Sequence, residues 1–154
     1  MGKALIAGSI LFVTIGLAGV IGAPYLMKFV TPPALGVFTT WLLPAVVIGA
    51  IPFVILGYQI TDDAILIRRL FWTTNLSRSG LKSAEVMPEA MKGSLRLFGN
   101  GGGFSFAGFY WNKTLGNYRA FVTNPKRPVV LRYSFKTIVV SPDNPEDFVK
   151  ELSA

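Results

Sequence analysis

The pattern of apolar and polar positions divides the chain into two parts of different character. Residues 4–23 and 34–57 contain no charged side chain, and each stretch is long enough to cross the apolar core of a bilayer as a helix. Pro44 and Pro52 interrupt the second stretch, and a membrane helix tolerates such prolines as kinks. Residues 1–57 are therefore predicted to form a transmembrane helical hairpin.

A cleaved secretory signal peptide is the alternative interpretation of the first apolar stretch. The stretch is longer than the usual apolar region of a signal peptide, and Pro24 would hinder cleavage after Ala23. A retained helix is favoured. Lys3 precedes the first stretch and two arginines follow the second, whereas only Lys28 lies between them. This bias predicts that both termini lie in the cytoplasm.

The remainder of the chain, residues 58–154, alternates between short apolar runs and turn residues, which is typical of β-strands. About seven strands are predicted, with turns at 62–63, at 115–117 and at 124–128. The last segment has a different pattern. Asn144 can cap a helix, proline occupies the first helical position and two acidic residues follow, so a C-terminal helix is predicted at about 145–152.

Composition and charge narrow the possible functions. Only 15% of the 154 residues are charged, against about 25% in an average soluble domain, and 51% are hydrophobic. The chain has no cysteine and no histidine, which excludes thiolate chemistry and removes the commonest general base and metal ligand. We therefore expect a non-enzymatic protein with no cofactor and no metal.

The glycine-rich stretch at 99–103 could be a phosphate-binding loop or a turn between strands. A dinucleotide fingerprint would need glycine where Phe104 stands, and no Gly-Lys-Ser/Thr sequence ends a P-loop here. A turn or bulge is favoured, because glycine adopts backbone angles that other residues avoid. Six aromatic residues lie close by, and most are expected in the core: Phe98, Phe104, Phe106, Phe109, Tyr110 and Trp111. The alternative is that Phe104 and Phe106 contact the bilayer or a partner.

The basic residues of the second part give a further set of candidate contacts. Residues 59–154 hold 13 of the 15 basic residues and all 8 acidic ones, and hence a net charge of +5. Arg68, Arg69, Lys126 and Arg127 are the candidate contacts to anionic lipid. The alternative needs no ligand. The basic residues can simply be solvated, and their excess can reflect the preference of membrane proteins for basic residues on the cytoplasmic side. Nucleic acid is not expected, because no basic and aromatic recognition motif is present.

Three motifs resemble one bacterial group of pleckstrin-homology-like (PH-like) domains. They are Y-x-I-x-x-D-x-x-L-I at 58–67, R-x-F-G-N-G-G at 96–102 and S-P-D-N-P-E-D-F-V at 141–149. The resemblance implies a small β-barrel or sandwich closed by a C-terminal helix, often preceded by two transmembrane helices. It also implies that the chain can form homo-oligomers.

Together these features predict an α + β protein of the bacterial inner membrane. Residues 1–57 form the anchor and residues 58–154 the PH-like domain. The expected function is protein interaction or assembly at the cytoplasmic face of the membrane, with a protein partner or a second copy. Recognition of anionic lipid headgroups is the alternative.

Overall fold

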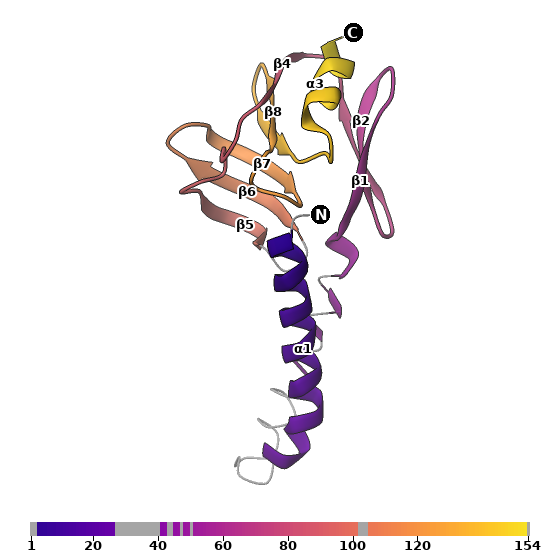
Figure 1. Ribbon diagram of the computed structural model, residues 1–154, viewed down its shortest axis with the longest axis vertical. Helices are drawn as coiled ribbons and strands as arrows, with labels where there is room; N and C mark the ends of the chain where they lie inside the picture. The colour runs from indigo at the N-terminus through magenta and orange to yellow at the C-terminus, as the bar shows by residue number, and fades with distance from the viewer. Residues whose placement is uncertain are drawn as a thin grey trace.

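The computed structural model shows one long helix joined to a β domain (Figure 1). It describes residues 3–26, 41–42, 45–46, 48–49, 51–101 and 105–153.

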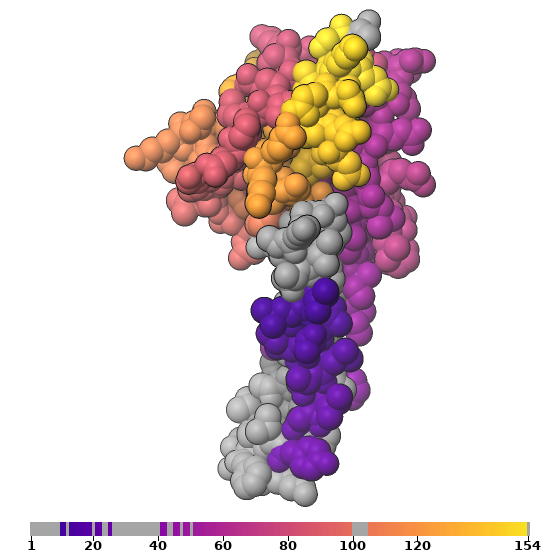
Figure 2. All heavy atoms as spheres, in the orientation of Figure 1, coloured from indigo at the N-terminus to yellow at the C-terminus, as the bar shows by residue number. Residues whose placement is uncertain are grey.

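Helix α1 (Lys3–Leu26) extends away from the β domain (Figures 1 and 2). Large apolar side chains such as Ile10, Leu11, Leu17 and Ile21 are exposed on more than one side of it. Within the part of the chain that is described, no helix has both the length and the apolarity that crossing a membrane requires. The fold itself therefore gives no support to the predicted transmembrane hairpin.

The second predicted span, 34–57, lies partly outside the described residues. Its described end is not a membrane helix: the short 3-10 helix η2 (Ile51–Phe53) leads directly into strand β1 (Ile55–Ile60). Pairing of β1 with the following strand begins at Ile55, so the β domain starts earlier than the predicted boundary at residue 58.

The described residues of the β domain form nine strands in two sheets, instead of the predicted seven or so. A three-stranded sheet has the order β1-β2-β3, and a six-stranded sheet has the order β4-β8-β9-β7-β6-β5. The strand that the sequence pattern did not reveal is β3, whose polar sequence TTNLS buries only Leu76. The other strands are β2 (Ala64–Arg69), β3 (Thr73–Ser77), β4 (Leu81–Val86), β5 (Leu95–Gly101), β6 (Phe106–Asn112), β7 (Gly116–Val122), β8 (Val129–Tyr133) and β9 (Thr137–Val140).

The predicted C-terminal helix is confirmed as α3 (Pro145–Ser153). The amide of Phe148 donates to the carbonyl of Asn144 at 3.1 Å, so the helix begins at the expected cap residue. The Phe148 ring is buried and meets the Tyr58 ring edge-on, with 6.5 Å between the two ring centres. The helix thus closes one end of the space between the two sheets, where Figure 2 shows it beside the three-stranded sheet.

The six-stranded sheet has a core on each of its faces. The first core lies between the sheets, where Ile65 and Ile67 of β2 meet Phe121 and Leu131 of the larger sheet. The second core lies on the opposite face and is covered by the segment between β4 and β5, which contributes Ala90, Met87 and Met91. Alternate residues of β7 and β9 therefore enter different cores.

The prediction that the aromatic residues fill the core is wrong for most of those described. Tyr110 is buried, but Phe98 is 76% exposed, Phe109 is 50% exposed and Trp111 is 38% exposed. Phe98 of β5 pairs with Phe109 of β6. Both side chains lie on the face of the larger sheet that points towards the three-stranded sheet. The smaller sheet does not bury these side chains.

The glycine-rich stretch is part of a strand as far as Gly101. Gly99 has a φ of 111° and pairs directly with Gly108 of β6. A Cβ atom on Gly99 would lie 2.4 Å from the carbonyl oxygen of Ala107, so the two strands approach too closely for a side chain. A register shift lies just before the glycines, between Arg96 and Phe98, whereas Gly99 to Gly101 pair regularly with β6. The rest of the predicted turn, 102–104, lies outside the described residues.

Tyr58 joins the two sheets through a buried hydroxyl group. The hydroxyl donates to the carbonyl oxygen of Phe121 at 2.6 Å and lies 3.3 Å from the Ser141 Oγ. The same Ser141 Oγ accepts from the amides of Thr123 at 2.7 Å and Asn124 at 3.1 Å. Burial raises the pKa of Tyr58 above its ordinary value of 10.0, and the hydrogen bonds with Ser141 lower it in part.

We expect Tyr58→Phe to cost about 1 to 2 kcal/mol of unfolding free energy at neutral pH, because the Phe121 carbonyl loses its donor. A raised pKa in the folded state means that the neutral phenol stabilises the fold. That contribution is complete below pH 10.0 and is lost as the pH rises through the folded-state pKa. The variant should therefore lose less stability than the parent between pH 10 and 11. Urea unfolding followed by circular dichroism checks both effects, and an unchanged alkaline slope would contradict the second.

Candidate functional site

A groove runs between the two sheets and is lined by aromatic rings and two arginines. A space of about 390 Å³ lies between β3 and strands β6, β7 and β9. A second space of about 200 Å³ is lined by Phe53, Arg69, Trp72, Phe98 and residues of β6 and β7. Both spaces are lined by Thr74, Phe109 and Arg119, so they adjoin, and we call them together the inter-sheet groove.

Arg69 is buried at one end of the inter-sheet groove. Ile65 and Ile67 of β2 point into the core, and the alternation of the strand sends Arg69 to the same side. Its side chain is only 8% exposed, and its guanidinium lies 5.6 Å from the centre of the Trp72 ring and 5.3 Å from that of Phe121.

The hydrogen bonds of Arg69 are incomplete. Its Nη1 donates to the carbonyl oxygen of Phe53 at 3.4 Å, which is a long bond. Its Nε is buried and has no hydrogen-bond partner among the described residues. A buried donor without a partner costs free energy, and more so when it is charged.

Arg119 brings a second positive charge to the same aromatic ring. It lies on β7, where Tyr118 and Ala120 enter the second core and Arg119 takes the opposite face. Its guanidinium stacks 4.7 Å from the centre of the Phe121 ring and 5.5 Å from that of Phe109. Arg119 remains exposed on the open side of the groove.

No acidic side chain neutralises either arginine among the ion pairs of the described residues. Those pairs join Lys92 to Glu89, Arg127 to Glu146 and Arg132 to Glu85. Burial lowers the pKa of Arg69, and the positive charge of Arg119 lowers it further, whereas Tyr58 opposes these effects. A guanidinium stays protonated in proteins, so the groove holds two positive charges of which one is desolvated.

The four basic residues predicted to contact lipid do not form one cluster. Arg68 is exposed on the other face of β2, whereas Arg69 is buried. Strand alternation separates the two neighbours. Lys126 and Arg127 lie in the turn between β7 and β8, where Arg127 forms an ion pair with Glu146 of α3. Their contact with lipid stays a prediction.

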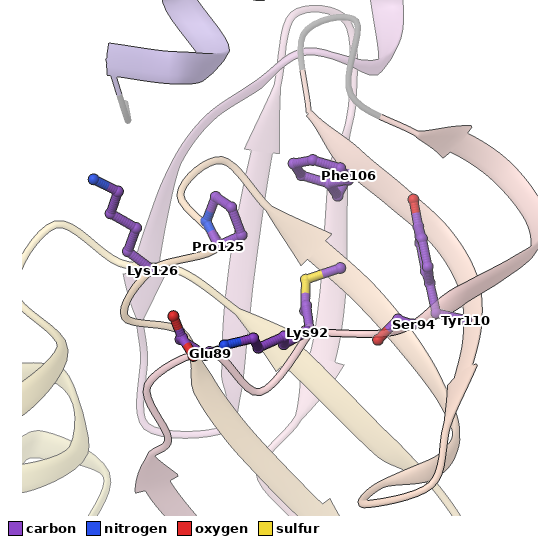
Figure 3. Close-up of a pocket in the computed structure, with 8 residues that line it drawn as sticks. Glu89, Lys92, Ser94, Phe106, Tyr110, Pro125 and Lys126 are labelled. Atoms are coloured by element: carbon purple, nitrogen blue, oxygen red, sulfur yellow. Dashed lines mark hydrogen bonds and ion pairs between the residues drawn. The ribbon is translucent and has the colours of Figure 1, made fainter.

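Of the two aromatic candidates, Phe104 lies outside the described residues. Phe106 begins β6 and is partly buried against the second core. It also lines a separate hollow of about 330 Å³, with Lys126 at one side and Tyr110 at the other (Figure 3). Contact of Phe106 with a bilayer or a partner stays a prediction.

The hollow in Figure 3 has few groups that could do chemistry. Its Ser94 Oγ accepts from Tyr118 at 2.6 Å and from Asn112 at 2.9 Å, and no general base is placed to activate it. Lys92 and Glu89 pair with each other at 2.9 Å. No group of acidic residues suited to a metal ion occurs among the described residues.

Sequence reasoning missed Arg119 and the rings of Phe53 and Phe121. The alternation in β7 does separate Arg119 and Phe121 from Tyr118 and Ala120, so it placed the two residues on one face. The pattern did not reveal that Arg69 approaches that face, since this depends on how the two sheets pack.

The family comparison covers the whole β domain. The model of the bacterial PH domain family matches residues 56–154, which is most of the chain. No curated protein and no solved structure is similar enough to match it. The matched range begins within β1 and includes both sheets, α3 and the residues of the inter-sheet groove other than Phe53. The chain therefore belongs to the bacterial PH domain family.

Proposed function

We propose that this chain is a non-enzymatic interaction module that residues 1–57 hold at the cytoplasmic face of a bacterial inner membrane. In this proposal a protein partner, or a second copy of the chain, binds the exposed face of β5 and β6. Membership of the PH domain family supports a role in protein or lipid interaction.

An exposed apolar patch on the edge of the larger sheet carries the proposal. The patch, which we call the edge patch, comprises Leu95, Leu97, Phe98, Phe109 and Trp111, each between 38% and 76% exposed. Aromatic side chains are enriched in protein interfaces, and contiguous exposed apolar patches mark such sites. Strand β5 is also the last strand of its sheet, so its outer edge can pair with another strand.

The apolar surface at the start of the β domain supports the membrane location. Helix α1 exposes apolar side chains on several sides, as a helix does when its surroundings are apolar. Next to η2, the turn between β2 and β3 exposes Leu70, Phe71 and Trp72. Apolar and aromatic side chains at the anchored end of a domain favour the bilayer interface.

The test uses a photoreactive phenylalanine analogue at Phe98 in the full chain, expressed in bacterial cells. We expect the protein in the membrane fraction and a defined covalent adduct to one protein species after irradiation. Phe135 is the matched control, because it is fully exposed in the turn between β8 and β9, outside the edge patch. An adduct at Phe98 with lipid only, or equal adducts at both positions, would refute the proposed partner face. Recovery in the soluble fraction would refute the membrane location.

A further inference from the structure

We propose that the inter-sheet groove binds a phosphate group between Arg69 and Arg119, with the apolar part of the ligand against the surrounding rings. This site shares Phe98 and Phe109 with the edge patch, but its ligand is proposed independently of the edge-patch partner. The ligand is a phosphate monoester or diester, supplied either by a lipid headgroup or by a small soluble compound.

The first argument is the unsatisfied hydrogen-bonding capacity of Arg69. Its side chain is more than nine-tenths buried, its Nε has no partner, and its bond to the Phe53 carbonyl is long at 3.4 Å. Arg69 and Arg119 both line the smaller space, which measures about 200 Å³. An anionic oxygen in that space would lie beside a charged guanidinium whose hydrogen bonds the described residues leave incomplete.

The second argument is the uncompensated charge. Arg69 and Arg119 both stack on Phe121, within 5.3 Å of its ring centre, and their charges repel each other. Neither takes part in an ion pair among the described residues. Stacking on aromatic faces offsets part of the free-energy cost of holding two positive charges close together. An anion between the two guanidinium groups would neutralise their charges directly.

Phosphate fits this arrangement better than a single carboxylate does. Two guanidinium groups that approach one space offer several donors, and a phosphate offers more acceptor oxygens and more charge than a carboxylate. The space also has an apolar wall formed by Trp72, Phe98 and Phe109. A phosphate ester with a short apolar portion satisfies both features.

The position of the groove allows either source of phosphate. Phe53 of η2 and Trp72 of the β2–β3 turn border the smaller space, next to the exposed Leu70 and Phe71. η2 follows directly on the apolar N-terminal part of the chain. A lipid phosphate could therefore enter from the bilayer interface, and a soluble ester could enter from the open side at Arg119.

The experiment follows Trp72 in the full chain labelled with 5-fluorotryptophan in a neutral detergent. The chain has three tryptophans, so three fluorine signals are expected, and single Trp→Phe variants assign them. One titration adds glycerol phosphate, and a second adds micelles of phosphatidylglycerol or phosphatidic acid. We expect a saturable shift of the Trp72 signal, because Trp72 stacks on Arg69, with a smaller change at Trp111.

The variants separate a binding role from a structural one. Arg119→Met and Arg69→Met should each weaken binding by about tenfold or more, as expected for loss of a charge-assisted hydrogen bond. Arg68→Met removes the same charge from the outer face of β2 and should bind like the parent. Because Arg119 is exposed, Arg119→Met is expected to fold even if Arg69→Met does not.

Each outcome is decisive. A Trp72 shift with both ligands would show that the phosphate group itself is recognised. A shift with the lipid alone would identify a lipid headgroup as the ligand. A shift with glycerol phosphate alone would identify a soluble ester. No saturable shift with either ligand would overturn the proposal. A shift that Arg119→Met leaves unchanged, or that Arg68→Met weakens equally, would overturn it as well.

Discussion

Gly99→Ala is expected to destabilise the β domain by about 3 kcal/mol or more, because two separate penalties combine at this position. The backbone φ of 111° lies in a region that side chains rarely adopt. In addition, the new Cβ would lie 2.4 Å from the Ala107 carbonyl oxygen and 2.6 Å from the Cα of Gly108. Backbone atoms of a paired strand cannot move aside as a flexible side chain can.

Two other glycines serve as matched controls for this substitution. Gly80 has a φ of 81° with no atom within 4 Å of an added Cβ, so Gly80→Ala tests the backbone penalty alone. A loss of about 1 to 2 kcal/mol is expected there. Gly57 has open space and no positive φ, so Gly57→Ala should be close to neutral. Chemical denaturation of the three full-length variants gives the comparison, and equal losses at Gly99 and Gly80 would show that the close strand approach is not costly.

Phe121→Ala is expected to cost about 3 to 5 kcal/mol of unfolding free energy. The side chain is 1% exposed and belongs to the core between the sheets. Its ring also supports the guanidinium groups of Arg69 and Arg119. Removal of the ring would therefore create a cavity and withdraw the stacking partner of both charges.

Phe121→Leu separates the two contributions. Leucine retains most of the apolar volume but offers no aromatic face, so the expected loss is about 1 to 2 kcal/mol. Thermal unfolding in low and high salt gives the second readout. High salt should raise the melting temperature of the leucine variant more than that of the parent. Salt screens the repulsion between the two arginines, which the leucine variant no longer offsets by aromatic stacking. A leucine variant as unstable as the alanine variant would contradict this division.

The elements with local signals could be predicted from the sequence. Asn144 and Pro145 identify the start of α3, and the residues at 62–63 and 124–128 identify turns between strands. The turn predicted at 115–117 lies at 113–115, because Gly116 already begins β7. These signals depend on the backbone preferences of a few neighbouring residues. The β3 strand lacked such a signal, because four of its five residues are polar and only Leu76 is buried.

The features that depend on packing between distant strands could not be predicted. Alternation in β6 places Phe109 and Trp111 opposite Tyr110, but it does not say which face another sheet covers. The exposed aromatic face exists because the smaller sheet leaves this part of the larger one open. The close approach of Arg69 and Arg119 in the groove likewise depends on how the two sheets pack.

Parallel pairing of β7 with β9 is a non-local step in the assembly of the larger sheet, as is the antiparallel pairing of β4 with β8. The meander β5-β6-β7 and the hairpin β8-β9 each join strands that are neighbours along the chain, so short loops suffice to close them. Joining β7 to β9 requires the chain between them to fold back as a unit. Both cores draw side chains from β7, β8 and β9. This step therefore brings side chains of both cores together, and with the pairing of β4 and β8 it should set the pace at which the domain reaches its native state.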